Sequence, residues 1–321
     1  MEIYGTLGPA CANAVVLEQM FRCGMTGLRL NLSHTSLEES APLLEQMHLA
    51  AERCGVRPQL LIDLQGPELR VGKQGLPLLL EEGVRLPLRR LALPEHLYAA
   101  LQPETELLLD DGRLCVRVLP AGEGLVLRGG TLAPGKSVAV PGLCAALPAL
   151  TAADRKNLSL ASAFGVTGVM QSFVRSREDV EEVRTALCGT GLRHFAKLEN
   201  RAGLDSLEQW IRLPDVLVIA RGDLGNAVPL WELPGVQKQV AALARQAGKP
   251  FLVVTQMLAS MERTAVPTRA EVSDIFNAVL DGASALMLTG ETAAGRYPAE
   301  AMDYFCRTIR AAEAFLREER N

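Results

Sequence analysis

Short apolar runs alternate with segments of helical periodicity along most of the chain. Eight runs have the length and composition of buried strands: residues 3–6, 27–31, 59–63, 166–171, 194–197, 216–219, 250–254 and 285–288. Apolar residues at helical spacing occupy segments between or after them, at 36–53, 177–187, 235–247 and 298–317. Repeated strand and helix units predict parallel strands joined by right-handed crossovers. Eight such units predict closure into a (β/α)8 TIM barrel, an α/β fold.

The alternation stops after the third predicted strand. Residues 71–137 contain frequent Gly and Pro, short apolar runs and the turn signal Asp110-Asp111-Gly112. We therefore predict a small β-rich lid domain at 71–137, inserted into a catalytic barrel formed by residues 1–70 and 138–321. An insertion at this loop lies at the C-terminal face of the barrel, where barrel enzymes keep their active sites, so we expect a lid over the active site.

Composition and charge narrow the class of protein. The 321 residues are 48% apolar and only 4% aromatic, which favours helix-rich α/β packing. The net charge of −4 is small and the basic residues are scattered, so we expect no nucleic-acid or membrane partner. No basic leader and no apolar stretch of about 20 residues is present. We expect a cytoplasmic protein, with its seven widely spaced cysteines reduced.

Polar side chains follow nearly every predicted strand. A barrel enzyme carries its catalytic residues at the C-terminal ends of its strands, so apolar residues at these ends would have argued against an enzyme. In chain order the strand ends supply Thr6; Arg29, Asn31 and Ser33; Asp63; Ser172; Lys197 and Glu199; Arg221 and Asp223; Thr255; Thr289 and Glu291.

Two carboxylates and one ammonium are expected to converge. Period-2 alternation puts Lys197 and Glu199 on the same side of the fifth strand, and Asp223 follows the sixth. Magnesium is typically held by one or two carboxylates together with substrate oxygens, which makes a phosphate-bearing substrate natural. Each acidic residue taken alone is also compatible with an exposed strand end or a helix cap.

Basic residues could neutralise phosphoryl oxygens. Arg29, Arg70, Lys136 and Lys197 suit this role, although any one of them is also a normal solvated surface group. The segment Arg221-Gly222-Asp223-Leu224-Gly225 could present backbone N–H groups to an anion such as a carboxylate, or form a simple turn.

A second group of oxygens lies across the second and third strands. Asn31, Ser33 and Asp63 suit a monovalent cation, but equally a structural hydrogen-bond network, and their spacing does not separate these two readings.

The same strand ends carry motifs that resemble the pyruvate kinase family. The matching segments are TLGPA at 6–10, RLNLSH at 29–34, GPELR at 66–70, KLEN at 197–200, ARGDLG at 220–225, residues 255–261 with 267–274, and LTGET at 288–292. The resemblance runs from about residue 3 to about residue 312 and is weakest across the insertion. It implies phosphoryl transfer between phosphoenolpyruvate and ADP, giving pyruvate and ATP in the last step of glycolysis.

The resemblance also implies roles for the catalytic and substrate-binding residues. Lys197 would contact the transferred phosphoryl group and the forming enolate, and Arg29 would face the phosphoryl group. Glu199 and Asp223 would bind Mg²⁺ or Mn²⁺. The amides of Gly222 and Asp223, with Thr255, would hold the pyruvate carboxylate, and a water relay near Thr255 and Thr289 would protonate enolpyruvate.

Further positions match the family's potassium and nucleotide sites. Asn31, Ser33, Asp63 and the Leu64 carbonyl would coordinate K⁺, and Glu68 matches the members that look K⁺-dependent. The ADP or ATP would contact Pro9, His34, Arg70 and Lys136.

The chain departs from the family pattern in several places. It stops after the eighth barrel helix, so we expect the C-terminal regulatory domain to be absent, and the lid is shorter than usual. Gln65 stands where Lys is usual, which removes one positive charge near the nucleotide, and Leu64 replaces Thr. Gln171 replaces Ala, and Thr289 replaces Ser but keeps the hydroxyl.

These departures leave two alternatives to a working pyruvate kinase. One is a divergent paralogue that uses the same metal and enolate site on another phosphorylated or 2-oxo acid, for example to decarboxylate oxaloacetate. The other is a non-catalytic homologue that binds ligand without turnover. A homodimer is the expected assembly.

Overall fold

The computed structural model describes residues 1–33, 35–110, 112–140 and 147–319, and its larger part is a closed barrel. The strands run in the order β1-β16-β15-β14-β13-β12-β3-β2, and every neighbouring pair is parallel, which confirms the predicted (β/α)8 fold. Their bounds are β1 Glu2–Thr6, β2 Gly27–Asn31, β3 Gln59–Asp63, β12 Gly168–Gln171, β13 Arg193–Leu198, β14 Val216–Ala220, β15 Phe251–Val254 and β16 Ala285–Met287.

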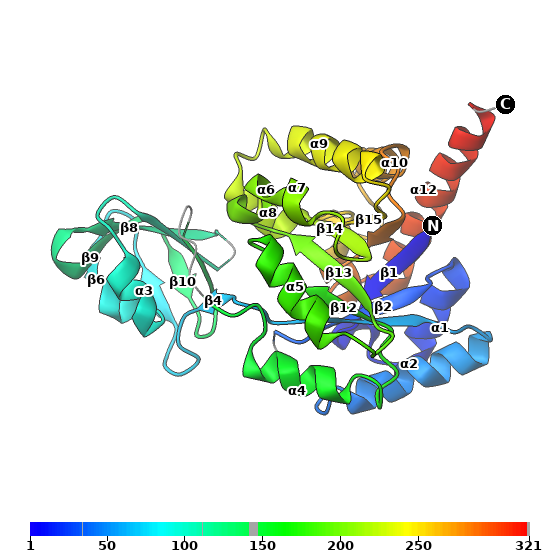
Figure 1. Ribbon diagram of the computed structural model, residues 1–321, viewed down its shortest axis with the longest axis horizontal. Coiled ribbons are helices and arrows are strands. Elements are labelled where there is room, and N and C mark those ends of the chain that lie inside the picture. Colours follow the sequence, from blue (N-terminus) through cyan, green and yellow to red (C-terminus); the bar gives the residue numbers. More distant parts are fainter. Residues whose placement is uncertain (34, 111, 141–146, 320–321) are drawn as a thin grey trace.

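Helices surround the barrel (Figure 1). Their bounds are α1 Ala14–Cys23, α2 Ala41–Cys54, α4 Ala152–Leu160, α5 Arg177–Ala186, α6 Arg201–Asp205, α7 Leu207–Trp210, α8 Arg221–Ala227, α9 Leu233–Gln246, α10 Arg269–Leu280, α11 Gly290–Ala293 and α12 Pro298–Glu318, with the short 3-10 helices η1 Pro9–Cys11 and η4 Ala259–Glu262. None of the helices in the described residues is long and apolar enough to cross a membrane.

One predicted helix starts later than expected. The pattern predicted a helix over 36–53, but α2 begins at Ala41. Residues 37–40 form a turn instead. The Ser36 amide donates to Glu39 Oε2 at 2.9 Å and the Glu39 amide donates to Ser36 Oγ at 3.2 Å, a reciprocal capping pattern that favours a helical turn at this point. The turn does not continue into α2 because Pro42, in the first turn of that helix, has no N–H to donate to the carbonyl of Glu38.

Period-2 alternation divides the apolar residues of the barrel into two clusters. One face of each strand fills the interior, where Tyr4 packs edge-on against Phe195. The other face packs against the helices and forms the larger cluster, which includes Trp210 and Phe305. Because the interior is filled by side chains, chemistry is confined to the ends of the strands.

The inserted segment forms a separate antiparallel structure with its own apolar cluster. It contains a six-stranded sheet in the order β4-β11-β7-β8-β9-β6 and a separate two-stranded sheet, β10-β5. Bounds are β4 Leu69–Arg70, β5 Leu78–Leu80, β6 Arg85–Pro87, η2 Leu88–Leu91, α3 Glu95–Ala100, β7 Glu106–Leu109, β8 Leu114–Leu119, η3 Pro120–Gly122, β9 Glu123–Arg128, β10 Gly130–Leu132 and β11 Ser137–Ala139.

The two chain segments that join this domain to the barrel lie side by side. Strands β4 and β11 pair antiparallel, with Ser137 opposite Arg70, so the small sheet extends from Leu69 to Ala139. The small domain is inserted in the chain after β3, and it lies to one side of the barrel in Figure 1. The predicted turn at 110–112 connects β7 and β8, although Asp111 itself lies outside the described residues.

Candidate active site

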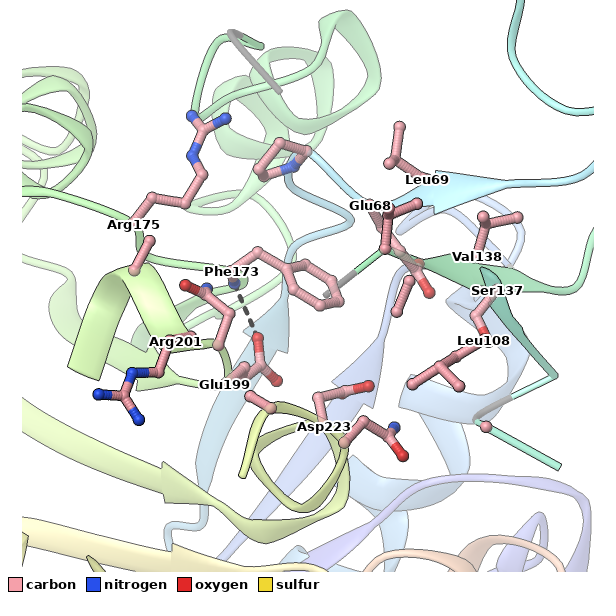
Figure 2. A pocket seen from close by; sticks show the side chains of 18 of the residues that line it. Glu68, Leu69, Leu108, Ser137, Val138, Phe173, Arg175, Glu199, Arg201 and Asp223 are labelled. Carbon is pink, nitrogen blue, oxygen red and sulfur yellow. Dashed lines mark hydrogen bonds between the residues drawn. The ribbon is translucent and has the colours of Figure 1, made fainter. Parts of the chain in front are cut away.

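A cavity of about 620 Å³ lies between the small domain and the C-terminal ends of β13 and β14. Figure 2 shows Glu199 and Asp223 pointing into it from the barrel, with Leu108, Ser137 and Val138 of the small domain on the opposite side. Phe173 lies between these two walls. The predicted pair of carboxylates therefore lines one cavity.

Lys197 is at the centre of a buried network. Its Nζ lies 2.9 Å from Glu199 Oε1, 3.0 Å from Asp63 Oδ1 and 3.0 Å from Ser172 Oγ. Burial alone would lower the pKa of Lys197, but the charges of Asp63 and Glu199 outweigh it and hold that pKa above its usual value. The side chain is therefore a permanent cation at the strand ends.

Asp63 connects this lysine to Arg29. The Arg29 guanidinium donates to Asp63 Oδ2 from Nε at 2.8 Å and from Nη2 at 2.6 Å. Burial would raise the pKa of Asp63, but Lys197 and Arg29 lower it below the usual value. Arg29 Nη1 also reaches Thr6 Oγ1 at 3.4 Å. Two cations thus share one buried carboxylate.

The donors of Glu199 and Asp223 fit a divalent cation. Glu199 is oriented from both sides, by Lys197 at Oε1 and by the Phe173 amide, which donates to Oε2 at 2.7 Å. Each oxygen of Glu199 keeps a further lone pair for a metal. The described part of the chain holds no grouping of three or more His, Cys, Asp or Glu arranged for a metal. Two carboxylates that leave other positions to substrate oxygens are what magnesium prefers.

Thr255 and Gly222 meet where β14 and β15 end. Gly222 lies in the first turn of α8, and a Cβ at this position would lie 3.0 Å from Thr255 Cγ2. Thr255 has φ +83° and Gln256 has φ +56°. A left-handed conformation costs a non-glycine residue about 1–3 kcal/mol and is rarest for β-branched residues, so the surrounding contacts must hold it.

Thr289 is positioned by a buried glutamate. Glu291 accepts the Thr289 amide at 2.7 Å and the Thr289 hydroxyl at 3.3 Å on Oε2, and its Oε1 accepts the Leu258 amide at 3.0 Å. Glu291 therefore joins the loops that follow β15 and β16, which carry Thr255 and Thr289.

The oxygens expected at a monovalent cation are neighbours. Asn31 and Asp63 are paired across β2 and β3. Asn31 Oδ1 accepts the Ser33 amide at 3.0 Å, and the Leu64 carbonyl accepts Ser172 Oγ at 2.6 Å. These bonds are those of a hydrogen-bond network. The Asn31 and Leu64 oxygens each retain a lone pair that a cation could use, whereas both oxygens of Asp63 already accept from Lys197, Ser172 or Arg29.

The structure brings together two of the four residues expected at the nucleotide. Arg70 and Lys136 come from the paired segments that lead to and from the small domain, where the Val71 amide donates to the Lys136 carbonyl. Arg70 bonds Glu68 Oε2 at 2.7 Å and the Gly135 carbonyl at 2.8 Å, and Lys136 pairs with Asp110 at 2.7 Å. Burial raises the pKa of Glu68, and the charge of Arg70 reverses only part of this increase.

The other two nucleotide candidates are Pro9 and His34. Pro9 begins η1, directly beyond β1, and does not line the cavity. His34 lies outside the described residues.

Sequence reasoning missed two groups that complete the site. Ser172 was recognised as a strand end but given no role, yet its hydroxyl contacts Lys197, Asp63 and the Leu64 carbonyl. The amide that orients Glu199 belongs to Phe173, which has φ +55°. A backbone donor of this kind leaves no signal in side-chain chemistry.

Acidic and basic side chains gathered at the C-terminal ends of barrel strands define a TIM-barrel enzyme. The family model for the pyruvate kinase barrel domain matches residues 1–87 and 91–302. The chain belongs to the pyruvate kinase family, whose members are metal-dependent phosphotransferases.

Relatives from distant organisms agree with the family model. A pyruvate kinase of Methylorubrum extorquens is 39% identical, over 97% of this chain and 68% of that protein. One from Aeropyrum pernix is 38% identical over 96% of this chain and 69% of its own length, and one from Mycobacterium tuberculosis H37Rv is 38% identical over 97% and 70%.

Proposed function

We propose that this protein transfers a phosphoryl group from phosphoenolpyruvate to ADP, giving pyruvate and ATP. The observation that carries the proposal is the buried Lys197 ammonium, fixed between Asp63 and Glu199, with Glu199 and Asp223 both lining one cavity. A phosphoryl transfer requires mainly positioning and stabilisation of charge, and this arrangement provides both.

The reaction breaks the bond between phosphorus and the enol oxygen of phosphoenolpyruvate. A β-phosphate oxygen of ADP forms the new bond to phosphorus, and the electron pair of the broken bond stays on the enolate oxygen. Lys197 is cationic and buried, so it stabilises the developing negative charge on that oxygen and on the transferred phosphoryl group. Arg29, held by Asp63, neutralises further oxygens of the transferred phosphoryl group.

Glu199 and Asp223 hold Mg²⁺ or Mn²⁺ in this proposal. The bound ion supplies Lewis-acid stabilisation of phosphoryl and enolate oxygens. Asn31, Ser33, Asp63 and the Leu64 carbonyl hold K⁺. The paired position of Asn31 and Asp63 on β2 and β3 supports this set of ligands.

Protonation of the enolate at its methylene carbon completes pyruvate. The hydroxyls of Thr255 and Thr289 are the groups we assign to the proton relay, and Gly222, Asp223 and Thr255 hold the substrate carboxylate. The contact between Gly222 and Thr255 supports the shared role of these residues.

The nucleotide is assigned to Pro9, His34, Arg70 and Lys136. Arg70 and Lys136 lie at the junction between the barrel and the domain at 71–137, so closure of that domain as a lid would bring their charges to the phosphates. Lys136 would then exchange Asp110 for a phosphate oxygen. We further propose a cytoplasmic location and a homodimer.

The test measures pyruvate formation from phosphoenolpyruvate and ADP with Mg²⁺, with and without K⁺, beside a panel of other phosphorylated acids and oxaloacetate. We expect turnover with phosphoenolpyruvate that depends on Mg²⁺ and increases with K⁺. Decarboxylation of oxaloacetate without kinase turnover would support the paralogue. Binding of phosphoenolpyruvate without any product would support a non-catalytic homologue.

A further inference from the structure

Thr255 is held in its left-handed conformation by a side chain from the neighbouring strand end. Arg221 donates to the Thr255 carbonyl from Nε at 3.2 Å and from Nη2 at 2.8 Å. The same Nη2 lies 2.8 Å from Met257 Sδ. A forked guanidinium fixes both the position and the orientation of the carbonyl that it binds.

Arg221 is itself fixed from the opposite side. Its Nη1 lies 2.8 Å from Asp274 Oδ1 and 2.7 Å from Asp274 Oδ2, and Asp274 belongs to α10. Gln237 of α9 is a further, longer partner of Nη1 at 3.5 Å. The Arg221 side chain is only 11% exposed, whereas Asp274 is 34% exposed, so the guanidinium is buried while its carboxylate partner keeps contact with water. The guanidinium is therefore a rigid brace between α10 and the end of β15.

The brace connects two parts of the proposed site. Arg221 directly precedes Gly222 and Asp223 at the start of α8. Its guanidinium holds Thr255, whose side chain packs on Gly222. One residue thus sets where the proposed carboxylate-binding amides and the Thr255 hydroxyl stand relative to each other.

We propose that Arg221 is a positioning residue, which acts through Thr255 by holding it in the strained conformation that directs its hydroxyl to the substrate, with Asp274 holding Arg221. This inference rests on the proposed function only for the part that Thr255 plays in the proton relay. The conformational part, that the Thr255 segment loosens without the fork of Arg221, does not depend on any activity.

The first readout is amide hydrogen exchange of peptides that contain residues 252–258. The Arg221→Lys variant keeps the charge but loses the fork, and we expect exchange in this segment to rise at least about threefold. Asp274→Asn should give a smaller rise in the same segment. The matched control is Arg177→Lys, an exposed arginine that pairs with Glu181 away from the cavity. Unchanged exchange at 252–258 in Arg221→Lys would overturn the inference.

The second readout is a double-mutant cycle on two reactions, pyruvate formation and exchange of the pyruvate methyl protons with deuterium in D₂O. We expect Arg221→Lys to lower both rates about tenfold or more while KM for ADP stays within about twofold. In a Thr255→Ala background the same substitution should lower the rates less than about twofold, because the group it acts through is gone. Full additivity of the two substitutions would show that Arg221 does not act through Thr255.

Discussion

Lys197 and Glu199 stand two residues apart at the end of β13 and form a buried ion pair, with Nζ 2.9 Å from Oε1. Since alternate residues of a strand share a face, one strand supplies both the cation that we propose for the developing enolate and a ligand that we propose for the divalent cation. The two side chains orient each other, and Phe173 fixes the remaining oxygen of Glu199.

Glu199→Gln should weaken metal binding more than folding. The amide oxygen can still accept a hydrogen bond, but the charge that attracts the cation is lost. We expect the Mg²⁺ concentration for half-maximal rate to rise about tenfold or more, with a similar effect in Asp223→Asn. Titration of the rate with Mg²⁺ and Mn²⁺ measures this. Glu208→Gln, an exposed carboxylate on α7, is the control, and an equal response in that variant would argue against the metal assignment.

Acid should destabilise the protein through His194. This ring is buried, its Nε2 lies 2.8 Å from Gln171 Oε1, and its Nδ1 has no hydrogen-bond partner among the described residues. Burial lowers the pKa of His194 to about 4. The charge of Asp215 raises this pKa, and the charges of Arg184 and Lys249 lower it slightly, so burial remains the dominant effect. Because Gln171 Nε2 donates to the Asp179 carbonyl, Gln171 Oε1 is the acceptor and the neutral ring carries its proton on Nε2.

The unfolded chain therefore binds a proton at His194 between pH 6.5 and 4 that the folded chain does not. The neutral, buried ring therefore contributes to the free energy of unfolding in full above pH 6.5. As the pH falls from 6.5 towards 4, the free energy of unfolding decreases by up to about 3 kcal/mol through this group. Urea unfolding at pH 7.5 and pH 5 measures the slope, which His194→Asn should reduce. The same slope in the variant and in the unchanged protein would contradict the assignment.

Gly8→Ala should disturb the site from the end of β1. A Cβ at Gly8 would lie 2.4 Å from the Ala293 carbonyl oxygen and 2.8 Å from the Ala293 Cα, so the backbone of α11, just beyond Thr289, must move. We expect a loss of about 1–3 kcal/mol in the free energy of unfolding and a lower kcat. Gly235→Ala on α9 has nothing within 4 Å and should be neutral or slightly stabilising. Equal effects at both positions would contradict this account.

Gln65→Lys should restore a positive charge beside the proposed nucleotide site. The Gln65 amide is held by Asp154 Oδ1 at 2.8 Å, so the backbone at this position is already fixed. One added charge near the phosphates is worth about 1 kcal/mol, which corresponds to about a fivefold lower KM for ADP. Gln65→Met, which nearly keeps the length of the glutamine side chain and carries no charge, is the control. A fall in KM in both variants would show that charge is not the cause.

Patterns that act locally were visible in the sequence, whereas contacts between distant segments were not. The eight barrel strands and the charged strand ends follow from apolar runs and period-2 alternation. The structure places Glu199 and Asp223 at one cavity, and Lys197 pairs with Glu199. The helix over 36–53 was wrong at its start because Pro42 cannot donate the backbone hydrogen bond that would join the turn at 37–40 to α2.

The remaining features depend on side chains that meet only after folding. Arg221 reaches the carbonyl of Thr255, 34 residues away, and no local pattern indicates that a threonine there has a positive φ. Gln171 was noted as a departure from the family pattern without a physical reason, and the structure supplies one, because its amide bridges His194 and the Asp179 carbonyl.

The central claim is that Lys197 stabilises charge during phosphoryl transfer, and Lys197→Met tests it most directly. The methionine approximates the length of the stem but removes the ammonium, so we expect kcat for pyruvate formation to fall by about three orders of magnitude or more. Lys238→Met, at an exposed lysine that pairs with Asp281, should retain its rate. If Lys197→Met, shown to be folded by its thermal unfolding, converts phosphoenolpyruvate and ADP to pyruvate at an undiminished rate, the account is wrong.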